Sequence, residues 1–317
     1  MKSLRTLIPI LLAVLMVTSC KEALDYDIPT AKPQLVVNSL FGRDSTWRIE
    51  VSTTAITGAG NQIESLKDAQ ITLLENGFEI ADLSVDSTFS NPWYQRTDGE
   101  EDDAESKFYY HYTAVTEAKA GKEYAIMVSY PGFETVTAVS TVPQAQRAIY
   151  RVDRNFEAIS IGGTEYAAVP FELHDNDRTN YFALELVTIS KTTGESEKIR
   201  FFSRENIFAQ NFDYRGAVVE NGIFYDSKNG VYFSNEDFKG EIKPLRIYVE
   251  SKYLTGDYDV KLRILNLSSE YYQFATTFQR QIRNQGNPFA EPAQVYSNIN
   301  NGLGIFAGYS VRQLDIR

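Results

Sequence analysis

The sequence predicts a mainly β protein, in which an N-terminal immunoglobulin-like or transthyretin-like sandwich is followed by a second β-rich domain with one C-terminal amphipathic helix. Three observations lead to this fold class. Aromatic residues make up 13% of the 317 residues and are nearly all Tyr and Phe, which favour strands. Short runs alternate apolar and polar residues with the period of a strand, and one segment near the C-terminus has a clear helical period.

Residues 1–19 have the pattern of a signal peptide. Lys2 and Arg5 form a positively charged start, and a mostly apolar run extends from Leu7 to Val17. A membrane-spanning helix needs about 20 apolar residues, so this run is too short to be one. We therefore expect the segment to direct export and to be removed.

The residues at the end of this run resemble a bacterial lipobox: the branched Val17, the small residues Thr18 and Ser19, and then Cys20. The resemblance implies cleavage before Cys20, a diacylglyceryl group on its thiol and an acyl chain on its new amine. More than one chain is what stable anchoring requires. The alternative is an ordinary secretory signal with an incidental cysteine. Since Cys20 is the only cysteine, lipidation leaves no free thiol, disulfide or thiolate ligand.

The acidic composition argues against nucleic acid as a partner. The chain holds 31 basic and 42 acidic residues, a formal net charge of −11, and loss of residues 1–19 removes Lys2 and Arg5 without removing an acid. Such a surface repels a phosphate backbone. The length and the 43% hydrophobic content suit one large or two ordinary domains that are stabilised by packing.

Residues 20–33 are predicted to form an acidic tether. Glu22, Asp25 and Asp27 follow the cysteine closely, and prolines mark the end of the segment. Acidic residues just after a lipidated cysteine resemble the surface-export signals of Bacteroidota lipoproteins. A solvated linker without such a signal explains the same residues, so both interpretations stay open. The sequence therefore does not assign the protein to the periplasmic or to the surface-exposed face of the outer membrane.

Residues 34–143 are predicted to form the first sandwich, because strand-like runs follow one another without a helical period. Trp47, Ile49 and Val51 alternate with polar neighbours, as in a half-buried strand. Asn76-Gly77, between two such runs, is a strong short hairpin signal. Strands are expected at 35–37, 47–51, 69–73, 78–85, 109–115, 124–130 and 134–142. Short strands at this spacing predict an antiparallel sandwich.

One loop of this domain carries neighbouring carboxylates between Asp98 and Glu105. Calcium takes about six to eight oxygen ligands. The spacing of these acids nevertheless lacks the alternate ligands, the central Gly and the final Glu of an EF-hand. We therefore expect a solvated loop and predict no metal site.

Residues 144–317 are predicted to form the second, β-rich domain. Its strands are expected at 147–152, 167–173, 181–190, 245–250 and 260–267. Residues 201–238 are rich in Phe, Tyr, Asn and Gly and give no clear register. Long irregular stretches of this kind often carry function.

The one clear helix is predicted at 269–284, with Ser268 as its N-cap and Glu270 in its first turn. An apolar stripe at helical spacing runs along it and consists of Tyr271, Phe274, Phe278 and Ile282. We expect this stripe to lie in the core rather than to bind a ligand. Gly286 and Pro288 then stop the helix.

The segment after the helix carries the most specific resemblance. The run "NPFAEP…VYSNI.NGLGIF" follows an aromatic helix that begins "SSEYY", and it resembles an uncharacterised family of Bacteroidota envelope lipoproteins defined as domain of unknown function 4249 (DUF4249). Weaker matches, such as "DAQITLLENG" and "DRTNYFALEL", extend over the mature chain. The resemblance implies a β-rich lipoprotein associated with a TonB-dependent outer-membrane transporter. It implies that Cys20 is the lipidated residue, and it identifies no catalytic residue.

Two histidines are the candidates for the commonest general base. His111 lies in an aromatic strand, where we expect it to be half exposed. His174 precedes Asp175-Asn176-Asp177, a polar turn that either holds a metal or simply reverses the chain. Neither has a histidine partner at zinc-binding spacing, and the chain has no G-x-S-x-G elbow. No catalytic, cofactor-binding or metal-binding residue is therefore predicted.

The predicted function is that of a membrane-anchored envelope lipoprotein, attached through lipid on Cys20. It is expected to be a non-enzymatic binding or accessory subunit beside a TonB-dependent transporter, with a small-molecule or peptide ligand unassigned. The alternative is a structural or assembly protein of the outer envelope, and a hydrolase is disfavoured. Asp44-Ser45-Thr46 and Asp86-Ser87-Thr88 also resemble the Bacteroidota O-glycosylation motif, although matches of three residues often arise by chance.

Overall fold

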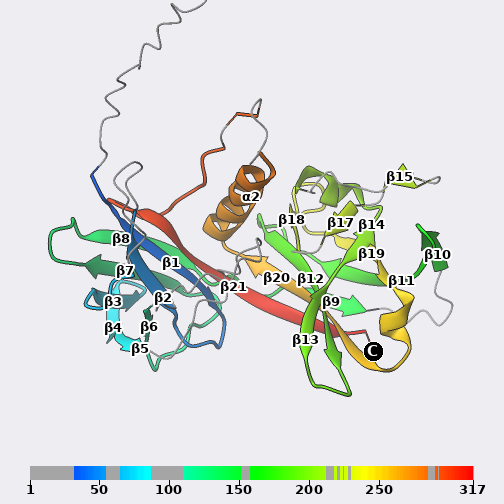
Figure 1. Cartoon of the computed structure of the whole chain (residues 1–317), viewed down its shortest axis with the longest axis horizontal. Helices are drawn as coiled ribbons and strands as arrows, with labels where there is room; N and C mark the ends of the chain where they lie inside the picture. Colours follow the sequence, from blue (N-terminus) through cyan, green and yellow to red (C-terminus); the bar gives the residue numbers. More distant parts are fainter. Residues whose placement is uncertain are drawn as a thin grey trace, which may run out of the picture.

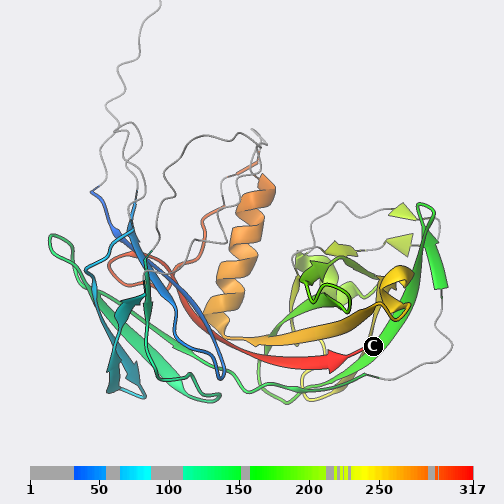
Figure 2. The same ribbon diagram turned by 60° about the horizontal axis from the view of Figure 1, so that its bottom comes forward.

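The structure, a computed structural model, describes residues 32–54, 65–86, 110–150, 158–211, 218–219, 222–223, 225–227, 230–284, 290–291 and 293–316. Two β-sandwiches lie side by side and share one long sheet (Figure 1). Helix α2 (Ser269–Asn284) stands on that sheet between them (Figure 2). The mainly β fold class with one C-terminal helix, predicted from the sequence, is confirmed.

The first sandwich packs two sheets around an aromatic centre. One sheet holds β1 (Leu35–Gly42), β2 (Ile49–Thr53), β6 (His111–Thr113) and β5 (Ser84–Asp86); the other holds β4 (Phe78–Asp82), β3 (Gln70–Glu75), β7 (Glu123–Ser129) and β8 (Val136–Thr141). The ring of Trp47 lies 4.7 Å from that of Phe41 and 4.9 Å from that of Tyr124, measured between centroids. Aromatic rings of this size bury a large apolar area each, which a sandwich of short strands needs.

Two local sequence signals in this sandwich are confirmed, and one predicted strand is divided in the structure. Asn76 and Gly77 join β3 to β4 with φ values of 50° and 84°, as a type I′ hairpin turn requires. Trp47, Ile49 and Val51 are fully buried. The strand predicted at 78–85 is divided, because the chain leaves one sheet after β4 and enters the other with β5.

The second sandwich also has two sheets. The first holds β20 (Tyr258–Leu267), β12 (Tyr181–Ser190) and β13 (Ser196–Ile199), and β18 (Val231–Ser234) also pairs with β12. The second holds β10 (Ala158–Ile161), β11 (Thr164–His174), β19 (Ile242–Glu250), β14 (Phe201–Ser203) and β17 (Tyr225–Ser227), with β9 (Arg147–Tyr150) beside β11. The remaining short elements are β15 (Val218–Val219), β16 (Gly222–Ile223), η1 (Asn206–Asn211) and η2 (Ser251–Leu254).

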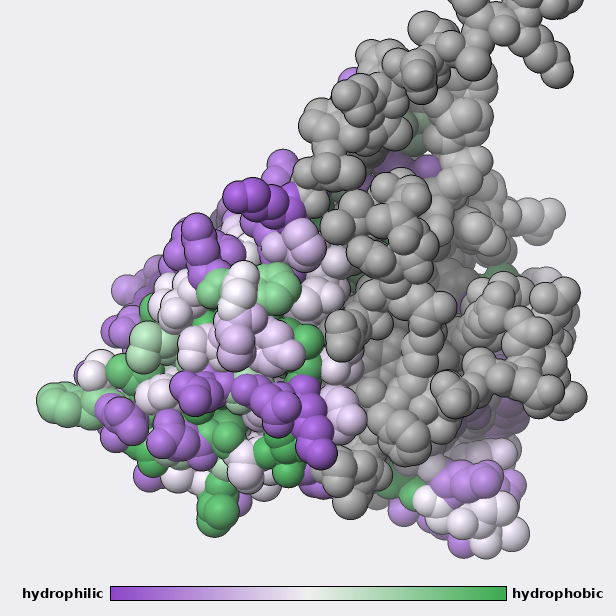
Figure 3. Space-filling view, turned by 60° about the vertical axis from the view of Figure 1, so that its left-hand side comes forward, coloured by the Kyte–Doolittle hydropathy of each residue, from purple (hydrophilic) through white to green (hydrophobic). Residues whose placement is uncertain are grey.

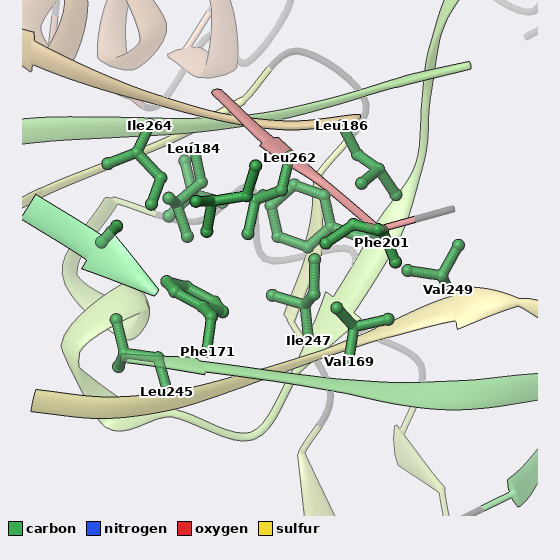
Figure 4. Close-up of a cluster of buried hydrophobic side chains, with 14 of the residues drawn as sticks. Val169, Phe171, Leu184, Leu186, Phe201, Leu245, Ile247, Val249, Leu262 and Ile264 are labelled. Carbon is green, nitrogen blue, oxygen red and sulfur yellow. The ribbon is translucent and has the colours of Figure 1, made fainter. Parts of the chain in front are cut away.

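The core of the second sandwich is aliphatic and aromatic. Figure 4 shows side chains of the first sheet that point toward those of the second: Leu184, Leu186, Leu262 and Ile264 on one side, and Val169, Phe171, Leu245 and Ile247 on the other. All of them are buried. Helix α2 lies beyond the first sheet, on the side away from this core.

Strand β21 (Leu303–Asp315) joins the two sandwiches. Its first half runs parallel to β1, from Leu303 opposite Val36 to Tyr309 opposite Gly42. Its second half runs antiparallel to β20, from Tyr309 opposite Leu267 to Asp315 opposite Lys261. The result is one nine-stranded sheet that crosses both lobes (Figure 1).

Two glycines allow β21 to run this close to its neighbours. A Cβ on Gly304, where φ is 113°, would lie 2.1 Å from the carbonyl oxygen of Val37. A Cβ on Gly308 would lie 2.3 Å from the carbonyl oxygen of Thr141. Neither position has room for a side chain. The glycines of the C-terminal run are therefore explained by strand packing.

The two cores do not follow the order of the chain. Ile299 and Phe306 belong to the core of the first sandwich, whereas Leu314 and Ile316 belong to that of the second. The division into domains at 34–143 and 144–317 stays a prediction. The structure adds that the last strand contributes to the cores on both sides of that division.

Candidate functional site

Helix α2 begins where the two sandwiches meet. Ser268 caps it, because its Oγ accepts a hydrogen bond from the Tyr271 N–H (3.2 Å), while its own N–H donates to the Gly308 carbonyl on β21 (3.0 Å). The hydroxyl of Ser140 on β8 donates to the Glu270 carboxylate (2.9 Å) and accepts from the Gly308 N–H (3.2 Å). The predicted N-cap is confirmed, and it ties the base of the helix to both sandwiches.

Tyrosines pack the first turns of α2 onto the outer face of the shared sheet. Tyr272 stacks on Tyr181 of β12 with ring centroids 4.6 Å apart, and Tyr271 meets the edge of Tyr309 at 5.8 Å. Burial raises the pKa of Tyr271 well above its usual value and raises the pKa of Tyr232 to about 12. These phenols are therefore uncharged near neutral pH, and their role is packing.

A charged row crosses three strands beside these tyrosines. The carboxylate of Glu185 on β12 accepts from Lys198 Nζ on β13 (2.6 Å) and from Arg263 Nη1 on β20 (3.0 Å). Both cations are partly exposed, so solvent screens these pairs. A carboxylate held by two cations ties strands together and is not a free base.

The apolar stripe of α2 is buried only near the base of the helix. Tyr271 packs against the sheet, but Phe278 is 45% exposed and Ile282 is 53% exposed. Phe274 and Phe278 stack on one another with centroids 5.6 Å apart. The prediction that the whole stripe lies in the core is wrong for its second half. The physical reason is that the helix rises from the sheet (Figure 2), so its later turns have no sheet beneath them.

The chain that returns from α2 to β21 is held by polar side chains of the helix. The Tyr296 N–H donates to Thr277 Oγ1 (2.9 Å), and Asn284 Nδ2 donates to the Glu291 carbonyl (2.8 Å). These contacts lie on a polar side of the helix. The exposed stripe is therefore a separate surface, which we call the apolar tip and define as Phe278 and Ile282.

Asparagines of the C-terminal run cover the edge of β8. Asn300 exchanges two backbone hydrogen bonds with Thr137, and Asn298 Nδ2 donates to the carbonyls of Val139 (3.1 Å) and Phe306 (2.8 Å). An open strand edge would otherwise offer unpaired groups to another chain. The run "VYSNI.NGLGIF" therefore closes the first sandwich, a role that its sequence did not reveal.

His111 is buried, and the prediction of a half-exposed residue is wrong. Its exposed fraction is 0%, and its Nδ1 lies 3.4 Å from Glu50 Oε1. Its neighbour Tyr112 is 1% exposed on the opposite face, so both faces of β6 are covered and alternation fails there. Burial lowers the pKa of His111 and raises the pKa of Glu50.

The polar turn after His174 reverses the chain. The Asp175 carboxylate accepts from Asn235 Nδ2 (2.6 Å), from Asn180 Nδ2 (2.9 Å) and from the Gly240 N–H (3.2 Å). Asn235 is fully buried, so the carboxylate links two loops. Within the described part of the chain, no three His, Cys, Asp or Glu residues are grouped to hold a metal.

A shallow depression of about 220 Å³ lies at the edge of the second sandwich, where the chain crosses from β13 to β14. It is lined by Tyr166, Glu197, Lys198, Ile199, Arg200, Glu250 and Tyr253. Ligand pockets are usually larger, about 300–1,000 Å³, and mostly apolar. The charges here are partly used already, since Glu250 pairs with Lys252 (2.9 Å) and Lys198 pairs with Glu185. The depression is therefore a weaker candidate than the helix.

The outer face of the first sandwich carries dispersed apolar residues. Met127 is 45% exposed and Val139 is 48% exposed on neighbouring strands. Figure 3 shows apolar and polar residues interspersed over the described surface on that side of the molecule. Single exposed apolar residues are ordinary on a protein surface, so this face supplies no candidate site.

Several residues singled out from the sequence lie outside the described residues. They are the signal peptide 1–19, Cys20, the acids between Asp98 and Glu105, Ser87, and the helix-stopping Gly286 and Pro288. Ser45 is described, and its Oγ accepts from the Gly42 N–H (3.1 Å) and donates to the Gly42 carbonyl (2.7 Å). A sugar on Ser45 would break the donated bond in this turn.

Comparison with known proteins assigns a family and no activity. A family model described as "Domain of unknown function (DUF4249)" matches residues 21–315. This match confirms the resemblance seen in the sequence. No curated protein matches the chain. Among the helices that the structure describes, none is long and apolar enough to cross a membrane.

Proposed function

We propose that this chain, which belongs to the family described as Domain of unknown function (DUF4249), is an envelope lipoprotein anchored to the outer membrane through Cys20. It acts as a non-enzymatic binding or accessory subunit beside a TonB-dependent transporter. The proposed anchor is supported by the lipobox-like residues before Cys20, since the lipidation that they imply supplies the more than one acyl chain that stable attachment requires. The proposed association with a transporter is supported by the resemblance to the family.

The continuous sheet is the observation that carries the accessory role. Because β21 is hydrogen-bonded to β1 and to β20, the two lobes cannot slide past one another without breaking a strand ladder. A tethered protein of this kind holds two surfaces at a fixed separation. That property suits an adaptor that docks on a larger partner, and it does not depend on a reaction.

The placement of the acid–base residues also supports a non-enzymatic role. His111 is fully buried beside Glu50, and Asp175 is used to link two loops through Asn235 and Asn180. A general base must be within reach of a substrate proton. These groups serve the fold instead.

The test is affinity capture of the tagged, lipidated protein from native membranes, followed by mass spectrometry of its companions. The Cys20→Ser variant is the matched control, since it lacks the lipidated thiol but keeps every described residue. A stoichiometric TonB-dependent transporter with the wild type is the expected result. Its absence after gentle extraction would contradict the accessory role and favour the alternative of an envelope assembly protein.

A further inference from the structure

We infer that the apolar tip of α2, Phe278 and Ile282, inserts into the interface of the lipid bilayer that carries the anchor. The inference rests on the proposed attachment through Cys20 and adds a second contact with the same membrane. It fixes which end of the molecule faces the bilayer.

The first step is that the tip and the tether lie at the same end of the molecule. The tether joins the described chain at Lys32, just before β1 begins at Leu35. Figure 1 and Figure 2 both show the last turn of α2 on the side from which β1 starts. The apolar tip and the point where the tether joins therefore lie on one side of the molecule and can face one membrane together.

Lengths along the strands agree with this placement. The base of α2 is bonded to Gly308, and Gly308 follows Leu303, which lies opposite Val36 near the start of β1. Five residues of strand span about 17 Å at about 3.3 Å each. The 16 residues of α2 span about 24 Å at 1.5 Å each. A helix that rises back along the strands therefore reaches the level at which the tether joins.

The second step is the chemistry of the tip. Phe278 and Ile282 are among the few large apolar side chains that the described chain exposes, and they are adjacent on one helix face. The last two turns, Thr277 to Asn284, contain Arg280, which is exposed, and no acidic residue. This stretch is therefore opposite in charge to the chain as a whole, whose net charge is −11. Apolar side chains beside an arginine suit an interface whose headgroups are anionic.

The third step concerns local concentration. Leu35 lies fifteen positions after Cys20, and a chain of that length spans at most about 50 Å. An anchored tip is therefore confined near the bilayer, and tethering raises its effective concentration at the surface. A contact too weak to recruit the protein alone is sufficient to orient it.

The experiment uses the lipidated full chain in phosphatidylethanolamine and phosphatidylglycerol vesicles. Because Cys20 is the only cysteine and its thiol carries lipid, Phe278→Cys or Ile282→Cys gives a unique site for an environment-sensitive fluorophore. Phe78→Cys is the matched control. Phe78 is 78% exposed, and it follows Asn76, which bonds to Glu123 at the end of the first sandwich away from Leu35.

The expected result is that a lipid-borne quencher reduces the fluorescence of the labels at 278 and 282 at least threefold more than that of the label at 78. In the Ile282→Cys protein, the additional change Arg280→Glu is expected to reduce this difference about twofold in anionic vesicles. Equal quenching at all three sites would overturn the inference. Quenching at the tip that requires an added membrane protein would also overturn it, since the occupant would then be protein.

Failure of the anchor is distinguishable from failure of the tip. A protein that is not lipidated at Cys20 does not float with the vesicles, which contradicts the proposed function. A protein that floats but shows equal quenching at 78, 278 and 282 is anchored, and this result refutes insertion of the apolar tip into the bilayer. Two reporter positions guard against a local effect of one substitution, and circular dichroism checks that each variant is folded.

Discussion

The shared strand predicts that damage to the core of the second sandwich unfolds the first as well. Leu314 lies on β21 and is 8% exposed at the rim of the second core. Leu→Ala replacements in cores cost about 2–5 kcal/mol, and the rim position favours the lower end, about 2 kcal/mol. With a urea m-value of about 3 kcal/mol/M, the unfolding midpoint falls by about 0.7 M.

The assay distinguishes the two sandwiches because both tryptophans come before the second sandwich in the chain. The chain has two, Trp47 and Trp93, and Trp47 is fully buried in the first core. Fluorescence therefore reports on the first part of the molecule, whereas far-ultraviolet circular dichroism reports on both sandwiches. In Leu314→Ala, both midpoints are expected to fall together. Phe306→Ala, whose ring lies 4.5 Å from Phe41 in the first core, is expected to cost about 3–5 kcal/mol and to lower both as well.

One result would refute this reasoning. If Leu314→Ala leaves the fluorescence midpoint unchanged while circular dichroism splits into two transitions, the shared sheet does not couple the sandwiches. Val139→Ala is the control, because Val139 is 48% exposed. Surface replacements of that kind usually change the free energy of unfolding by less than about 0.5 kcal/mol.

Three further outcomes are expected. Gly304→Ala places a Cβ 2.1 Å from a backbone oxygen and should abolish the yield of folded protein, whereas Leu303→Ala should leave that yield unchanged. A normal yield of the Gly304 variant would contradict the close approach of β21 to β1 at this position. Burial lowers the pKa of His111 from 6.5, so the unfolded chain takes up the proton first and the wild type loses stability as the pH falls below about 6.5. His111→Gln should reduce this loss, as measured by urea midpoints at about pH 7.5 and 5.5. The same change in midpoint between these two pH values in both proteins would count against it. Asp175→Ala leaves the buried amide of Asn235 without its carboxylate, which should cost about 1–3 kcal/mol in urea unfolding, and an unchanged midpoint would show that the two loops are held by other contacts.

Local features were predictable because their causes are local. The helix 269–284 matches α2 residue for residue, since Ser268, the apolar spacing and the stop signals lie within a few residues of one another. The strand expected at 181–190 matches β12. The hairpin at Asn76-Gly77 follows from backbone preferences of those two residues. Each signal is complete within a short window of sequence.

The shared sheet was not predictable, because its cause is not local. β1 and β21 lie at opposite ends of the chain and pair in parallel, and no window of sequence contains both. The exposure of Phe278 and Ile282 was missed for a related reason. Periodicity shows that an apolar stripe exists, but only the angle at which α2 leaves the sheet decides how much of the stripe is buried. His111 was misjudged because alternation assumes one solvated face.

The most direct test of the proposed anchor is the intact mass of the mature protein extracted from native membranes. The expected species begins at Cys20, without residues 1–19, and carries a diacylglyceryl group on the thiol and a further acyl chain on the amine. In Cys20→Ser, the lipid mass is expected to be absent. A wild-type species that begins at another residue, or that begins at Cys20 without added lipid, would contradict the anchor and, with it, the membrane contact of the apolar tip.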